Sequence, residues 1–395
     1  MDPAAEAPFV LLVESHRDPE QERALLFTAP ERLIQCREPR AVPSALSDLE
    51  AAVSAGYHVA GFLAYEAGYG LLPKLAGLAC PELAEHALWF GVFPRLQELR
   101  GRAVGAWLAE RAGSQPASVT GLRFEREPQQ YRADFARIQR HLHAGDSYQV
   151  CQSLRARFDV RGSAMALFQR LRAAQVTPYS ALIDTGEYAL VSLSPELFFK
   201  KQQGKITLKP MKGTAAPGQD AADDARRAQA MRSDPKTRAE NVMIVDLLRN
   251  DIGRLAKPGS VRVPELFAVE RFDSVLQMTS TIEADLEPSL GVGSLMRALF
   301  PSGSVTGAPK LRTMQLIHEL EPSARGIFCG SIGYVTPSND ACFNVAIRSL
   351  FVDRAGHGRL GVGSGIVVDS QADAELDECL LKARFVSDAS GATSG

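Results

Sequence analysis

Two stretches with helical apolar spacing carry glutamates on the side that faces the protein interior. Glu240 lies one turn before an apolar stripe, and Glu375 and Glu378 lie in one row with Lys382 beside another. Two inward carboxylates can share a hard cation, and Mg²⁺ prefers oxygen ligands. Glutamates are also common on helix surfaces, and Glu378 with Lys382 fits an ordinary ion pair at a spacing of four residues. On the pattern alone, this second interpretation is the more ordinary one.

Lys212 lies in a turn flanked by a proline, after a strand-like run and before Gly213 and Thr214. A lysine held near a divalent cation loses its proton more easily, and the neutral amine is then a nucleophile or a base. Alternatively, Lys212 and the nearby lysines line a solvated strand edge, which protects against aggregation. Without further information, the strand-edge interpretation is again the more ordinary one.

Three glycine-rich stretches do not match the common nucleotide-binding loops. Residues 303–310 lack the Gly-Lys-Ser/Thr ending of a P-loop, and residues 361–365 precede a strand-like run where a dinucleotide-binding loop would precede a helix. Residues 330–333 are too short to identify a cofactor. Glycine lets backbone amides approach an anion closely, and it also forms tight turns, so both interpretations stay open.

The composition is that of a globular protein with a large core: 395 residues, 45% hydrophobic and 23% charged. A net charge of -2 gives no basic surface for a phosphate backbone, so we expect no nucleic acid partner. The N-terminus has no basic segment, and no run reaches about 18 apolar residues, so we expect neither export nor membrane insertion. The six cysteines lack C-x-x-C spacing, and we expect reduced thiols in a cytoplasmic protein.

Strand-like and helical stretches alternate without the regular repeat of about 30 residues that βαβ units produce. This favours an α+β fold, a two-layer α/β sandwich with large, mainly antiparallel sheets, over a doubly wound fold. The polar residues 111–130 are the best linker candidate, which divides the chain into an N-terminal α/β region, 1–120, and a catalytic domain, 121–390. Strands are predicted at 181–183, 189–193, 205–208, 327–335, 343–352 and 360–368, and helices at 221–232, 239–249, 295–300, 311–320 and 373–386.

Several motifs follow one another in an order and spacing that resembles the chorismate-utilising enzyme family. The resemblance covers residues 125–385 and is looser for the N-terminal region. It rests on Ser194-Pro195-Glu196, Lys209 to Thr214, Arg238-Ala239-Glu240-Asn241, Asp246 to Asp251, Pro301 to Lys310, Gly330 to Tyr334, Ala346-Ile347-Arg348, Gly363-Ser364-Gly365-Ile366-Val367 and the helix with Glu375 and Glu378.

Within this family, two positions indicate which nucleophile is admitted. Members that add water at C2 of chorismate have a lysine base where Gln149 stands, which disfavours isochorismate and salicylate synthases. Anthranilate synthases typically have alanine where Lys212 stands. The Met211-Lys212 pair is instead similar to the Pro-Ile-Lys-Gly-Thr segment of aminodeoxychorismate synthase component I. The resemblance therefore implies amination of chorismate at C4.

The mechanism implied by the resemblance uses Mg²⁺, held by Glu240 and Glu378 with Glu375 nearby, to bind the ring carboxylate of chorismate. Lys212 attacks C2 while Glu196 protonates the departing C4 hydroxyl. Ammonia then enters at C4 and expels the lysine, which gives 4-amino-4-deoxychorismate. Nucleophilic catalysis with a general acid thus divides one displacement into two.

The resemblance also implies substrate contacts and partners. Arg348 and Tyr334 are expected to anchor a substrate carboxylate, for which an arginine fork is well shaped. No cysteine lies in the Gly-x-Cys-x-Gly turn of a glutaminase nucleophile, so we expect a glutamine amidotransferase subunit to supply ammonia. An aminodeoxychorismate lyase on a separate chain is expected to release p-aminobenzoate. The remaining implied substrate contacts are Ser304, Gly363, Ser364, Gly365, Lys382 and Gln149.

Two residues depart from the pattern of relatives. Gln277 stands where many relatives have histidine, and an amide cannot protonate a leaving group as an imidazolium can. Any acid role therefore falls more heavily on Glu196. Thr237 replaces an acidic residue that some relatives place one turn before the metal glutamate, so support of the cation by outer-shell residues is expected to be weaker there.

Two alternatives to C4 amination remain open on the sequence. Anthranilate synthase component I belongs to the same class of enzyme, and Lys212 argues against it. The other alternative is a protein of this fold that binds a ligand or partner without turnover. The joint presence of Glu196, Lys212 and the three glutamates argues against that interpretation.

Overall fold

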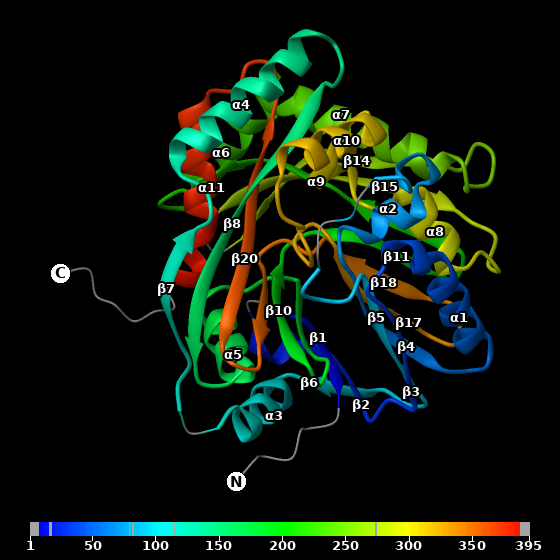
Figure 1. The fold of residues 1–395 in the computed structure, drawn as a ribbon. Helices are drawn as coiled ribbons and strands as arrows, with labels where there is room; N and C mark the ends of the chain where they lie inside the picture. Colours follow the sequence, from blue (N-terminus) through cyan, green and yellow to red (C-terminus); the bar gives the residue numbers. More distant parts are fainter. Residues whose placement is uncertain are drawn as a thin grey trace.

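The computed structural model describes residues 8–387 except 16–17, 79, 81–82, 114 and 273–274. Two ten-stranded sheets dominate the fold, and every strand pair among the described residues is antiparallel (Figure 1). The first sheet has the order β16 (Gly307–Ala308), β8 (Gln149–Arg161), β20 (His357–Ile366), β19 (Ser349–Asp353), β10 (Tyr188–Ser194), β9 (Tyr179–Asp184), β1 (Phe9–Glu14), β2 (Arg23–Thr28) and β6 (Gln97–Arg100), with β7 (Ser118–Phe124) paired to β8.

The second sheet, like the first, takes strands from both sides of residue 120. Its order is β13 (Met211–Ala215), β15 (Leu276–Asp285), β12 (Lys205–Lys209), β11 (Leu197–Gln202), β18 (Ala341–Asn344), β17 (Ser331–Val335), β4 (His58–Leu63), β5 (Leu88–Phe93) and β3 (Arg32–Cys36), with β14 (Arg262–Arg271) paired to β15. The predicted α+β class with large antiparallel sheets is confirmed.

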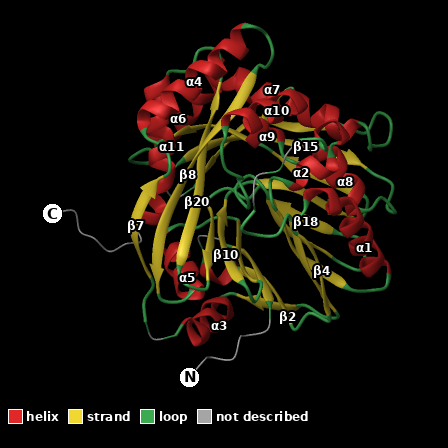
Figure 2. Cartoon of the chain, in the orientation of Figure 1, coloured by secondary structure: helices red, strands yellow, loops and turns green. Residues whose placement is uncertain are grey.

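The sheets pack against each other on one face and against helices on the other. β1 illustrates the cause: Val10 packs in the cluster between the sheets, while Phe9 and Leu11 pack on the helix side, because side chains alternate along a strand. Figure 2 shows the helices around the outside of the sheets. They are α1 (Val42–Ser54), α2 (Ala67–Leu71), α3 (Arg102–Ala112), α4 (Pro128–His143), α5 (Ala164–Ala174), α6 (Ala221–Ser233), α7 (Pro235–Gly253), α8 (Val292–Leu299), α9 (Gly303–Thr306), α10 (Lys310–Leu320) and α11 (Ala372–Ser387).

Two segments cross from one sheet to the other beside each other. The chain passes from β10 to β11 through Pro195 and Glu196, and it returns from β18 to β19 through residues 345–348. The Ser194 hydroxyl donates to the Val345 carbonyl at 2.6 Å, and the Val345 amide donates to the Glu196 carbonyl at 3.0 Å. The prediction of one strand over 343–352 is therefore wrong, because the chain changes sheets within it.

The region around residue 120 is structured. The linker predicted at 111–130 is wrong, since β7 forms there and pairs with β8, and Glu127 closes a capping box at the start of α4. Hydrophobic residues spaced along 118–124 let this polar stretch add a strand. Residue 120 lies inside β7, and strands from both sides of it share both sheets. Residues 388–390 of the predicted catalytic domain lie outside the described residues.

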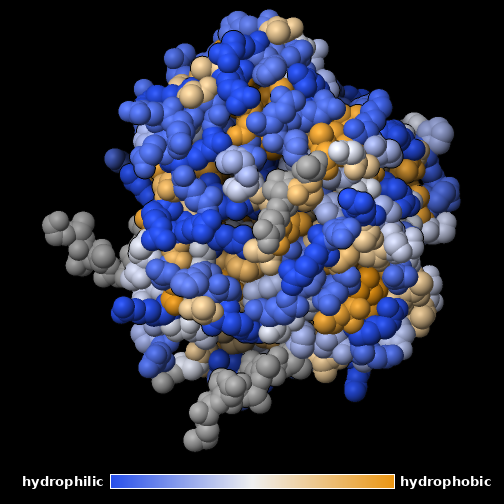
Figure 3. Space-filling model, viewed as in Figure 1, coloured by the Kyte–Doolittle hydropathy of each residue, from blue (hydrophilic) through white to orange (hydrophobic). Residues whose placement is uncertain are grey.

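The face shown in Figure 3 is mainly hydrophilic, with hydrophobic residues in separate patches. Within the described part of the chain, no helix is long and apolar enough to cross a membrane. The six cysteines form no disulfide within the described part of the chain, and three of them are buried.

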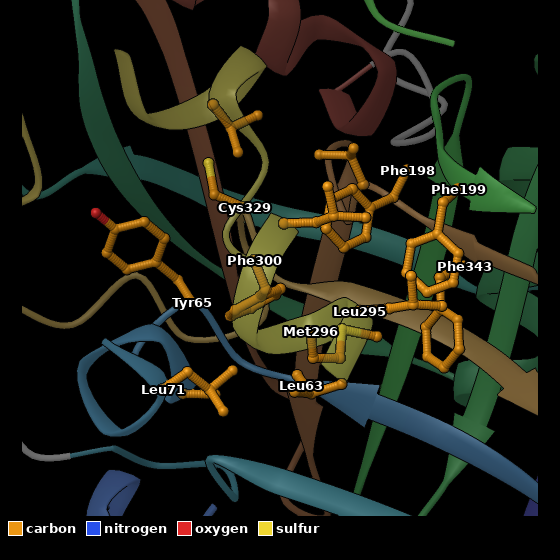
Figure 4. Packing of buried hydrophobic residues seen from close by; sticks show 14 of the residues in the cluster. Leu63, Tyr65, Leu71, Phe198, Phe199, Leu295, Met296, Phe300, Cys329 and Phe343 are labelled. Atoms are coloured by element: carbon orange, nitrogen blue, oxygen red, sulfur yellow. The ribbon is translucent and has the colours of Figure 1, made fainter. Parts of the chain in front are cut away.

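Phe343 is central to the core beneath the second sheet, where Figure 4 shows it beside Phe199. Its ring centroid lies 5.2 Å from that of Phe199, and its side chain is fully buried. We expect Phe343→Ala to destabilise the protein by about 3–5 kcal/mol, because the lost contacts leave a cavity. Urea unfolding measures this loss. Leu266→Ala, at a side chain that is 45% exposed, is the matched control and should change stability by less than about 0.5 kcal/mol. Equal effects of the two substitutions would contradict the packing described.

Candidate active site

Glu196 lies on the crossover from β10 to β11 and is buried, with only 4% of its surface exposed. The Ser304 hydroxyl, from α9, donates to Glu196 Oε1 at 2.6 Å. Burial raises the pKa of Glu196 to about 7, while the Ser304 hydrogen bond and the positive charges of Lys212 and Lys382 act to lower that pKa. A carboxyl group with this pKa can hold a proton near neutral pH and donate it to a leaving group.

The Lys212 amine reaches from β13 in the second sheet to β20 in the first. A Cβ atom placed on Gly365 would lie 3.0 Å from Lys212 Nζ and 3.2 Å from the Gln149 amide nitrogen. The missing side chain of Gly365 therefore leaves the space in which the Lys212 amine and the Gln149 amide meet. Lys212 thus lies on an edge strand, as the alternative interpretation expected, but the residue is half-buried and its amine lies close to Gly365 of the other sheet.

The Gln149 side chain is buried and unpartnered. Its exposure is 0%, and neither its amide nitrogen nor its amide oxygen has a hydrogen-bond partner among the described residues. An unsatisfied buried polar group costs about 1–3 kcal/mol. A ligand with a donor and an acceptor would satisfy both atoms, so the space beside Gly365 is a candidate binding site.

The glycines of β20 face this site, whereas Ser364 faces away from it. Gly363 and Gly365 share one side of the strand, and Ser364 points to the opposite side, because side chains alternate along a strand. The Ser364 hydroxyl lies 3.3 Å from the Tyr131 hydroxyl of α4. Of Ser364, only the backbone could therefore make the predicted contact with a substrate.

Three predicted metal ligands approach one another from two helices. Burial raises the pKa of Glu240, on α7, and so do the negative charges of Glu375 and Glu378 on α11, while Lys212 lowers it. The Ser370 hydroxyl donates to Glu375 at 2.7 Å. Carboxylate oxygens are the donor type that a hard cation prefers. Among the described residues, however, no group of three or more acidic, histidine or cysteine side chains is already arranged to hold a metal ion.

Lys382 connects α11 to β20. Its amine donates to the Gly363 carbonyl at 2.8 Å and to Glu378 Oε1 at 2.6 Å. The Lys382 side chain thus links Glu378, a predicted metal ligand, to Gly363, a predicted substrate contact. The ion pair expected from the spacing of four residues is confirmed, and it lies beside the candidate active site.

Arg348 lies beside the backbone of both candidate catalytic residues. It lines a small cavity with Pro195 and Met211, which precede Glu196 and Lys212 in the sequence. Burial lowers the pKa of its guanidinium, and no hydrogen bond or carboxylate of the described residues contributes to that shift. A guanidinium without a partner is suited to a carboxylate ligand.

The structure does not bring Tyr334 to this group. Tyr334, on β17, packs in the cluster between the sheets, with its ring centroid 6.1 Å from that of Phe27. Burial raises the pKa of its hydroxyl, and the charged groups that act on that pKa include Cys342, Arg23, Glu14 and Asp340, which are not among those acting on Glu196. Alternation along β17 explains the difference, because Tyr334 points to the interior between the sheets.

Two contacts of the site could not be read from the sequence. The Ser302 hydroxyl lies 2.9 Å from that of Ser304 and extends the hydrogen bonding of Glu196. Arg325 is buried and donates to the carbonyls of Cys151 and Val305, which follow Gln149 and Ser304 along the chain. Neither residue has a spacing signal, since both act through contacts between distant segments.

Comparisons with known proteins show which family the chain resembles. Residues 12–388 match the family model described as chorismate binding enzyme. Aminodeoxychorismate synthase component 1 of Klebsiella aerogenes is 45% identical over 280 residues, which are 70% of this chain and 62% of that protein. Anthranilate synthase component 1 of Streptomyces coelicolor is 38% identical over 256 residues, 65% of this chain and 50% of that protein.

A solved structure supports the fold across nearly the whole chain. Anthranilate synthase component I from Streptococcus pneumoniae has a TM-score of 0.80 and 24% identity, and the match covers 92% of this chain and 91% of that one. The chain matches less than two thirds of the length of the Klebsiella and Streptomyces relatives. The family model nevertheless covers almost all of the sequence, and the chain belongs to the chorismate-binding enzyme family.

Proposed function

We propose that this protein acts as an aminodeoxychorismate synthase component I, which converts chorismate and ammonia to 4-amino-4-deoxychorismate. The observation that carries this proposal is the site shared by the half-buried Lys212, the buried Glu196 carboxyl and the buried, unpartnered Gln149 amide. An amide at position 149 cannot act as the base that activates water, which favours an amine as the incoming nucleophile. The 45% identity with the Klebsiella component 1 supports the same reaction.

In the proposed reaction, the Lys212 amine attacks C2 of chorismate, and both conjugated ring double bonds shift as the C4 hydroxyl leaves. Glu196 supplies the proton that converts this hydroxyl to water. Ammonia then forms a bond at C4, and the C2 bond to Lys212 breaks as both double bonds return to their first positions. Arg348 is proposed to bind a substrate carboxylate. When bound, Mg²⁺ would supply positive charge for the ring carboxylate, and Glu240 and Glu378, with Glu375 nearby, are the residues that would hold it.

Two partners belong to this proposal. The name of the Klebsiella relative, component 1, indicates a second component, and we assign that role to a glutamine amidotransferase that supplies ammonia. Conversion of the product to p-aminobenzoate is assigned to an aminodeoxychorismate lyase on a separate chain. Supplied ammonium replaces the first partner in experiments with this chain alone.

Product analysis tests the proposed reaction. We expect the protein to consume chorismate when Mg²⁺ and a high ammonium concentration are present, and to yield p-aminobenzoate only after an aminodeoxychorismate lyase is added. Removal of Mg²⁺ with a chelator should stop consumption, because the carboxylates of Glu240 and Glu378 would then face the substrate carboxylate without a cation. Chromatography with fluorescence detection measures both products. Anthranilate formed without the lyase would identify an anthranilate synthase instead, and no consumption would indicate a binding protein.

The pKa of Glu196 predicts how activity depends on pH. Because the free enzyme needs protonated Glu196 and its pKa is about 7, kcat/KM for chorismate should fall as the pH rises through this value. The Ser304 hydrogen bond stabilises the ionised form, so Ser304→Ala should raise the pKa and move the falling limb to higher pH. Initial rates with ammonium between pH 6 and 9 measure the limb. A limb that stays in place or moves to lower pH in the variant would exclude Glu196 as the acid.

Gly365→Ala tests the space in which Lys212 and Gln149 meet. The added methyl group would lie 3.0 Å from Lys212 Nζ, so the amine must shift by a few tenths of an ångström. We expect kcat to fall about tenfold, because misplacement on the order of 1 Å can cost about a hundredfold. Gly105→Ala is the matched control, since a Cβ there meets no atom within 4 Å. Steady-state rates of both variants decide the point, and an unchanged kcat in Gly365→Ala would remove this close approach from the mechanism.

A further inference from the structure

Gln277 holds the two residues that follow Lys212. From β15, its amide nitrogen donates to the Gly213 carbonyl at 2.7 Å, and its amide oxygen accepts from the Thr214 hydroxyl at 2.9 Å. Both ends of the amide are therefore bonded to the segment that carries the Lys212 amine. No other side chain contacts this segment through two hydrogen bonds among the described residues.

The segment needs this support because the strand pairing is irregular there. Met211 lies opposite Thr279 and Thr214 lies opposite Gln277, so two residues of β13 face the single residue Met278. Such a bulge redirects side chains and leaves part of the ladder unpaired. Lys212 and Gly213 are the two residues opposite Met278, and Gly213 has a φ of 87°, which glycine adopts readily. The Gln277 amide thus satisfies a carbonyl that the irregular ladder leaves free.

A helix covers the bulge from the other side. A Cβ atom on Gly213 would lie 2.3 Å from the methyl carbon of Thr237, on α7. The Thr237 amide in turn donates to Asp234 at 2.7 Å, which fixes the first turn of that helix. Gly213 is therefore confined between Gln277 and Thr237, and the direction of the neighbouring Lys212 side chain is confined with it.

We propose that Gln277 is a positioning residue that holds the Lys212 bulge in the geometry required for attack on the substrate. The proposal rests on the function proposed above. A side-chain amide does not ionise in the physiological pH range, so its role here is geometric. It gives a physical task to a residue at which this sequence departs from many relatives.

The test compares substitutions of Gln277 and Thr214. Gln277→Met keeps the length of the side chain and removes both hydrogen bonds, and Thr214→Val removes the hydroxyl alone. With chorismate, Mg²⁺ and ammonium, we expect Gln277→Met to lower kcat about tenfold or more, with KM for chorismate within about threefold of the wild type. Adding Thr214→Val to Gln277→Met should cost no further activity, because both substitutions break the same contact. Thr281→Val, on the same strand, is the control and should retain wild-type rates.

A second measurement does not depend on activity. Hydrogen exchange followed by mass spectrometry should show faster exchange for residues 211–215 in Gln277→Met than in the wild type or in Thr281→Val, because the bulge opens more often. Unchanged exchange in this segment, or a kcat within twofold of the wild type, would overturn the positioning role. If the wild type itself does not aminate chorismate, the proposed function fails, and the exchange data still decide whether Gln277 holds the bulge.

Discussion

The fold depends on two segments that cross between the sheets and are bonded to each other. One crossover carries Glu196, the other ends at Arg348, and the Val345 amide joins them through the Glu196 carbonyl. A single strand that changes sheets could shift along its neighbour, but two antiparallel crossovers fix each other's register. The carboxyl of Glu196 is consequently held where the two sheets meet, away from water, and that burial is what raises its pKa.

The site also depends on residues that lack side chains. Gly365 admits the Lys212 amine from the opposite sheet to within contact of β20, and Gly213 permits the bulge from which that amine extends. Neither sheet alone contains the site, because Lys212 comes from one sheet and Gln149 from the other. The unpartnered amide of Gln149 is stable in this environment only if a ligand or water satisfies it. The packing of the two sheets therefore brings together the groups of the candidate site.

The amino-acid sequence predicted those helices and candidate site residues for which a local pattern was sufficient. The apolar stripes predicted α7 and α11 and the inward carboxylate of Glu240, and the family motifs named Glu196 and Lys212. It failed where contacts between distant segments decide the outcome. Tyr334 lies between the sheets and Ser364 faces the helices, because the side of a strand that faces a site depends on which sheet covers it. The strand predicted at 343–352 changes sheets in its middle, and no local propensity marks that point.

The central claim is that the Lys212 amine is a nucleophile toward chorismate, and a covalent adduct tests it most directly. The protein should be incubated with chorismate and Mg²⁺ without ammonia, digested to peptides with a protease, and analysed by mass spectrometry. Lys212→Ala is the control. We expect Lys212 to gain the mass of chorismate less one water, and the control variant to gain none. An adduct on Lys209, or an adduct that persists in the control variant, would contradict that claim.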